Sequence, residues 1–161
     1  MNSYRVHGKG TDKYDNVRIG MNSRLDTIQA AILQVKLHAF DKEVESVNEA
    51  ARCYTRLLKD HVKTPVIPEG FGSSWAQYTI QLPTESQRNQ LQETLKQAGI
   101  PSMVYYPKPM HLQTAFRNEE SAAYGCPAAE RLCATVLSLP MHPYLNTSEI
   151  EYISKTLIAS L

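Results

Sequence analysis

An uninterrupted helical pattern over residues 24–59 is the strongest constraint on the fold of this chain of 161 residues. Neither proline nor glycine occurs between Leu25 and Leu58. A continuous helix of this length would reach about 54 Å, well beyond the breadth of a compact domain of this size. We therefore expect the helix either to bend near Phe40 and Asp41 or to extend toward a partner.

Apolar residues occupy two stripes of this predicted helix. The second stripe alternates spacings of four and three residues, the period of a helix that packs along its length. Two stripes on different faces favour burial of one of them against another chain or domain. The first stripe is Leu25, Ile28, Ile32, Val35 and Ala39, and the second is Leu33, Leu37, Phe40, Val44, Val47, Ala51, Tyr54 and Leu58.

The remaining sequence predicts three segments: an irregular loop over residues 1–22, the long helix over 23–60, and a small α/β domain, with α+β character, over 61–161. Capping-box patterns begin three helices, and Gly99 ends the second of them. Ser23 with Asp26, Thr84 with Gln87, and Asn146 with Glu149 are these patterns. After the long helix, the predicted order is a strand at 75–82, a helix at 84–98, a strand at 100–106, a loop at 107–125, a helix at 128–134, a strand at 136–139 and a final helix.

Composition narrows the class of protein. A net charge of +1 offers no basic excess to neutralise nucleic acid. The chain has neither an apolar run long enough to span a membrane nor an apolar leader after Met1. Its three cysteines form no CxxC pair, which favours buried thiols in a reducing compartment and no metal site. We expect a cytoplasmic protein that binds neither nucleic acid nor membranes.

Two clusters are candidate binding sites. Asn22, Ser23 and Arg24 stand at the predicted start of the long helix, where free N–H groups favour an anion. The alternative is plain helix capping by Ser23. Tyr105 and Tyr106, followed by prolines and His111, can line a sugar or nucleotide pocket. The alternatives are aromatic core packing for the tyrosines and a solvated loop position for the histidine.

Three ordered motifs resemble the DegT/StrS family of sugar aminotransferases, across essentially the whole chain. They are the run from Arg5-Val6-His7-Gly8 through Ile19–Leu33, then Val104–Pro107 with His111-Leu112-Gln113 and Phe116, and then Ser138–Leu145. The resemblance implies the C-terminal part of a fold-type I aminotransferase that uses pyridoxal 5'-phosphate (PLP). The pattern is most similar to members that aminate the 3-keto group of UDP-linked uronic-acid sugars for surface polysaccharides, with glutamate as amino donor.

The resemblance also implies roles for individual residues. Asn22 would contact the phosphate of PLP held by the neighbouring subunit of a homodimer, and Arg24 would approach the nucleotide-sugar substrate. Tyr106 matches a tyrosine near the substrate, and His111 would lie at the rim of the pocket. Tyr105 departs from the histidine that similar members carry, which puts the sugar specificity in question.

The lysine that binds PLP in this family precedes the segment matching Arg5–Gly8. None of the nine lysines of this chain occupies that position. We therefore expect no catalytic residue here and no transamination by this chain alone. The alternative function is a non-catalytic dimerisation or binding module that uses the long helix.

Overall fold

The computed structural model describes residues 1–12, 14–116 and 125–161 and divides into two compact units, Met1–Asp41 and Lys42–Leu161. Among the described residues, no helix combines the length and the apolar character needed to span a membrane. The predicted loop at 107–125 falls partly outside the described residues.

The first unit opens with a short helix, α1 (Asn2–Arg5), which the prediction of an irregular segment missed. Isolated antiparallel bridges then pair Val6 with Asn22 and Lys9 with Asn16. The two passages of chain approach so closely that a Cβ on Gly20 would lie 2.0 Å from the nitrogen of Gly8. The glycines of this segment therefore permit a close backbone pairing.

The long helix α2 spans Thr27–Leu58, so it begins later than predicted. The N–H of Ser23 donates to the carbonyl of Arg5 at 2.9 Å, which places Ser23 in the backbone pairing and not at a helix cap. Instead, the side chain of Gln29 reaches back to the N–H of Asp26 at 3.3 Å. The predicted capping box of Ser23 and Asp26 is wrong because a backbone partner distant in sequence holds Ser23.

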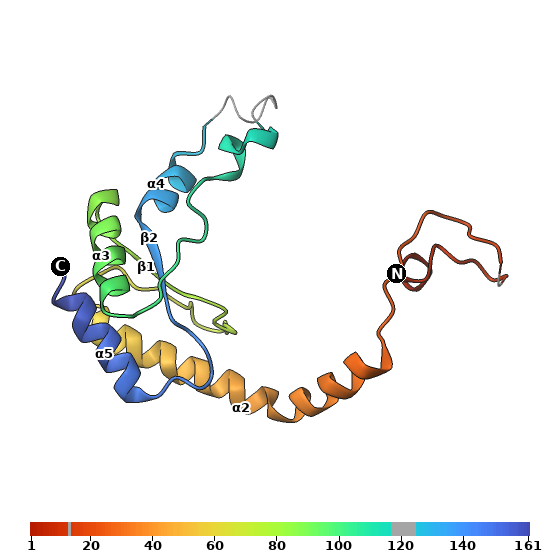
Figure 1. Ribbon diagram of the computed structural model, residues 1–161, viewed down its shortest axis with the longest axis horizontal. Helices are drawn as coiled ribbons and strands as arrows, with labels where there is room; N and C mark the ends of the chain where they lie inside the picture. Colours follow the sequence, from red (N-terminus) through yellow and green to blue (C-terminus); the bar gives the residue numbers. More distant parts are fainter. Residues whose placement is uncertain (13, 117–124) are drawn as a thin grey trace. The chain divides into compact units, whose positions relative to one another are not determined.

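The core of the second unit forms among the later turns of α2, a small sheet and two further helices (Figure 1). The strands β1 (Tyr78–Gln81) and β2 (Val136–Leu139) pair antiparallel, with Tyr78 opposite Leu139. The apolar residues of the second predicted stripe are buried from Val47 onward, whereas those of the first unit are exposed. The helices that complete this unit are α3 (Glu85–Gln97), α4 (Pro127–Thr135) and α5 (Thr147–Ile158), with short 3-10 turns at Met110–Leu112 and Thr114–Phe116.

Local signals predicted these later helices well. The hydroxyl of Thr84 accepts the N–H of Gln87 at 3.2 Å, and Gly99 follows the end of α3 with φ of +73°. Asn146 and Glu149 form the full capping box of α5, with both hydrogen bonds at 2.9 Å. These predictions are confirmed.

The predicted strand over 100–106 is wrong. Only Met103 pairs, in an isolated bridge to Ser138. Pro101 lacks an N–H to donate, so a longer hydrogen-bonded ladder does not develop there. The strand predicted at 75–82 is also shorter, because Trp75 adopts a φ of +47° that interrupts an extended backbone.

Candidate functional site

A cavity of about 800 Å³ lies between the segment 106–116 and helix α4 in the second unit. Tyr106 and His111 both line it, together with Met110 and Phe116. On the opposite side, the helix and its N-cap contribute Cys126, Ala129, Leu132 and Cys133. The structure thus brings two of the sequence-predicted residues to one largely apolar cavity with a few polar groups, the usual character of a small-molecule site.

His111 is fixed in this wall by a carboxylate. Its Nε2 atom lies 2.9 Å from Oε1 of Glu130, and its side chain is only 8% exposed. The reading of His111 as a solvated loop histidine is therefore wrong. The same oxygen of Glu130 accepts the N–H of Cys126 at 3.1 Å. The Cys126 N–H and the His111 imidazole together hold the pKa of the Glu130 carboxyl below its usual range.

Glu130 is the residue that the sequence did not identify. An acidic residue in the first turn of α4 is typical of a helix N-terminus, and that was its only sequence signal. Its pairing with His111 joins residues 19 positions apart across a loop. Such a pairing depends on tertiary structure, so no local pattern predicts it.

The two adjacent tyrosines differ in their positions. Their ring centroids are 6.0 Å apart with the planes at 81°, an edge-to-face contact. Tyr106 lines the cavity, whereas Tyr105 is not among its lining residues. Both are exposed, so the alternative of aromatic core packing is wrong for this pair.

Asn22 and Arg24 belong to the first unit and precede α2 by several residues. Their N–H groups are therefore not those of the first turn of a helix, and the helix-terminus argument for an anion site is wrong. Backbone pairing on both sides still fixes this stretch, since Met21 donates to Tyr4 at 2.7 Å and Ser23 to Arg5 at 2.9 Å. Both side chains are exposed and carry N–H donors that suit a phosphate or carboxylate.

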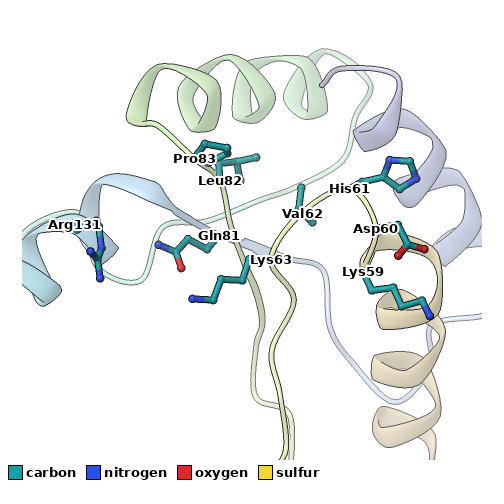
Figure 2. A pocket seen from close by; sticks show the side chains of 9 residues that line it. All are labelled: Lys59, Asp60, His61, Val62, Lys63, Gln81, Leu82, Pro83 and Arg131. Atoms are coloured by element: carbon teal, nitrogen blue, oxygen red, sulfur yellow. The ribbon is translucent and has the colours of Figure 1, made fainter.

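A second cleft, of about 690 Å³, opens where Lys63 pairs with Gln81 beside β1. Figure 2 shows that its lining side chains come from three segments: residues 59–63, which follow α2, the last residue of β1 with the two residues after it, and α4, which contributes Arg131. Three cations, Lys59, Lys63 and Arg131, outnumber the carboxylate of Asp60 and make it basic. None of the residues singled out by the resemblance lines this cleft, so the cavity of Tyr106 and His111 is the stronger candidate site.

Metal chemistry has no candidate in the part of the chain that the structure describes. Nowhere within residues 1–12, 14–116 and 125–161 do three or more His, Cys, Asp or Glu side chains gather as a ligand set. Among these described residues, no third ligand joins the pair of His111 and Glu130, and structural metal sites in proteins usually need four.

The chain belongs to the DegT/DnrJ/EryC1/StrS aminotransferase family, whose model matches residues 1–158. It is 40% identical over 152 residues to the UDP-2-acetamido-2-deoxy-3-oxo-D-glucuronate aminotransferase of Pseudomonas aeruginosa, an alignment that covers 94% of this chain and 40% of that protein. It is 42% identical over 153 residues to a "Pleiotropic regulatory protein" of Geobacillus stearothermophilus, covering 92% of this chain and 40% of that one.

A solved structure supports the same assignment. The fold is similar to a DegT/DnrJ/EryC1/StrS aminotransferase from Brucella abortus, with a TM-score of 0.89 and 46% identity over 98% of this chain and 42% of that one. The predicted α/β fold class is confirmed. The chain spans about two fifths of the length of the relatives that it matches.

Proposed function

We propose that this chain is the C-terminal, substrate-side portion of a PLP-dependent aminotransferase that transfers an amino group to a keto nucleotide-sugar for surface polysaccharide synthesis in the cytoplasm. The observation that carries this proposal is the 40% identity, over 94% of the chain, to an aminotransferase named for a UDP-linked 3-oxo sugar acid. The motifs that contain Tyr106 and His111 support it, because these residues line one cavity.

The residues present fit one end of PLP. The side-chain amide of Asn22 is exposed on a backbone fixed by its antiparallel bridge to Val6, and an amide donor suits a phosphate oxygen. When bound, PLP supplies the electron sink for amino transfer. Asn22 would hold the phosphate in the neighbouring subunit of a homodimer, and the lysine that anchors the cofactor would come from outside this chain.

The substrate-side residues would each contact a different part of the nucleotide sugar, according to their chemistry. The guanidinium of Arg24 can pair with a phosphate or carboxylate of the nucleotide sugar. The exposed ring of Tyr106 offers a stacking surface and a hydroxyl, and His111 a ring nitrogen in the cavity wall. Tyr105, beside Tyr106 but outside the cavity lining, would act at the edge of the site and tune which sugar is accepted.

A titration of the chain with UDP-N-acetylglucosamine, followed by NMR, tests the substrate side of this proposal. We expect the resonances of Tyr106 and His111 to shift on addition of the nucleotide sugar, and the shifts to diminish in Tyr106→Ala. Tyr144→Ala is the matched control, because Tyr144 is 74% exposed against 72% for Tyr106 and does not line the cavity. The proposal would be contradicted if the Tyr106 and His111 resonances did not shift on addition of the nucleotide sugar, or if both substitutions reduced the shifts equally.

A non-catalytic dimerisation or binding module is the second candidate function. The apolar side chains Ile28, Ile32 and Val35 of α2 are exposed, and an apolar surface of this kind favours association. The 42% identity to a protein named as a regulator also favours it. Dimerisation in sedimentation experiments, lost in Ile32→Glu, together with no response to nucleotide sugar, would favour this second function over the first.

A further inference from the structure

The carboxylate of Glu130 joins two parts of the cavity wall through one oxygen atom. Oε1 accepts the N–H of Cys126 at 3.1 Å, at the residue that precedes α4. The same atom lies 2.9 Å from Nε2 of His111, in the 3-10 turn on the other side of the cavity. The segment 106–116 is therefore fastened to the first turn of α4 at this point.

The chemistry of the pair determines which ring nitrogen carries the hydrogen. An ionised carboxylate only accepts hydrogen bonds, so Nε2 of His111 must be the donor. The hydrogen bonds from Cys126 and His111, which lower the pKa of Glu130, keep this carboxyl ionised at neutral pH. In the neutral imidazole, Nδ1 is then the nitrogen that accepts hydrogen bonds.

The two side chains of the pair differ in burial. The His111 side chain is 8% exposed, whereas that of Glu130 is 44% exposed. A second hydrogen bond, from Nε2 of Gln113 to the carbonyl of Lys108 at 3.1 Å, braces the same turn from within. The orientation of the imidazole is thus set by Glu130 and by the packing of the turn.

We propose that Glu130 is a positioning residue of the cavity: it fixes His111 with the hydrogen on Nε2 and leaves Nδ1 as the acceptor for a hydroxyl or amino group of the ligand. That the ligand is a nucleotide sugar rests on the proposed function, whereas the clamp between Glu130 and His111 does not. His111 then selects ligands that donate a hydrogen bond, and Glu130 acts only through His111.

NMR of the histidine side chains in the full chain tests the clamp. We expect an Nε2–H proton of His111 that exchanges slowly with water near pH 7 in the unaltered chain and is lost from the spectrum in Glu130→Ala. Glu130→Gln, which keeps an acceptor oxygen without the charge, should retain this signal at a shifted position. If Glu130 only filled space in the wall, the Nε2–H signal of His111 would not depend on an acceptor oxygen at position 130, and Glu130→Gln would not retain it.

Modification of Cys133 by iodoacetamide reports on the cavity wall, since this half-buried thiol lines it. We expect Glu130→Ala to increase the rate about tenfold, because losing a charge-assisted hydrogen bond favours local opening. Glu151→Ala is the matched control: the Glu151 side chain is 43% exposed and pairs with Lys155 on α5 at 3.5 Å. The control should leave the rate unchanged.

His111→Phe provides an independent variant should Glu130→Ala not fold. It keeps a ring in the turn without an Nε2–H donor, and we expect it to speed the modification of Cys133 as Glu130→Ala does. The double variant should add little to Glu130→Ala, because that substitution already removes the bond to His111. An unchanged Nε2–H signal in Glu130→Ala, or additive effects in the double variant, would overturn the proposal. These readouts need no nucleotide, so they succeed or fail separately from the proposed function.

Discussion

The hydroxyl of Tyr54 donates a hydrogen bond to the carbonyl oxygen of Pro140 at 3.0 Å, which ties the buried face of α2 to the residue that follows β2. Tyr54 is fully buried and stacks on Tyr78 with the ring centroids 5.0 Å apart. Burial raises the pKa of the Tyr54 hydroxyl well above its usual value, so it remains a donor throughout the physiological range. This bond fixes where the chain leaves the sheet.

Tyr54→Phe should therefore destabilise the second unit by about 1 kcal/mol, because it leaves the Pro140 carbonyl without this donor. Urea unfolding measures the change. Tyr152→Phe is the control, since Tyr152 is exposed and donates a comparable bond to the Ala98 carbonyl at 3.2 Å. Equal losses of unfolding free energy in the two variants would show that burial of the Tyr54 hydrogen bond adds nothing to its contribution to stability.

Replacing an apolar side chain by alanine should change the unfolding free energy differently in the two halves of α2. Leu58 is fully buried in the core, so Leu58→Ala should cost about 2–5 kcal/mol of unfolding free energy through lost burial and a residual cavity. Leu33 is 52% exposed, so Leu33→Ala should change the unfolding free energy of the monomer by about 0.5 kcal/mol or less. Thermal unfolding at low protein concentration separates these outcomes, and a large loss in Leu33→Ala would contradict the assignment of the core.

The caps provide a comparison between sequence pattern and structure. Asn146→Ala removes the cap of α5 and should cost about 1 kcal/mol. Ser23→Ala alters a residue that the sequence presents as an equivalent cap but that lies before α2, so its effect on helix content should be small. Circular dichroism during urea unfolding measures both effects. A loss of helix content in Ser23→Ala would show that Ser23 does cap α2, against the structure.

Sequence prediction succeeded here where the interacting residues are close in sequence and failed where they are far apart. Thr84, Gly99 and Asn146 were identified correctly because a cap and the group it satisfies lie within three or four residues. Ser23 was predicted wrongly because a distant backbone partner, Arg5, holds it. The strand at 100–106 was predicted wrongly because Pro101 lacks an N–H and only Met103 pairs. Tyr106 and His111 were singled out from motifs, whereas Glu130 has only a tertiary reason to matter.

The clamp at Glu130 should weaken in acid. The folded pKa of Glu130 is lowered, first by the Cys126 N–H and then by His111, so its stabilising contribution is present above the ordinary glutamate range. That contribution is lost as the pH falls through the lowered pKa. A pH titration of the Glu130 carboxyl carbon by NMR should give a midpoint below that of an exposed glutamate.

His111→Phe should move that midpoint upward without restoring it fully, because the bond from Cys126 remains. A midpoint for Glu130 equal to that of a free glutamate side chain, in the unaltered chain, would contradict this prediction. The same titration in His111→Phe distinguishes the two causes, since only the contribution of the imidazole disappears.

We propose that this chain supplies a wall of the substrate site and hydrogen-bond donors for a phosphate, and that the lysine that holds PLP lies outside it. Incubation with PLP, reduction with borohydride and peptide mapping by mass spectrometry test it directly. We predict that none of the nine lysines becomes labelled in a one-to-one ratio with the chain. Stoichiometric labelling of a single lysine, abolished when that lysine is replaced by alanine, would contradict this proposal.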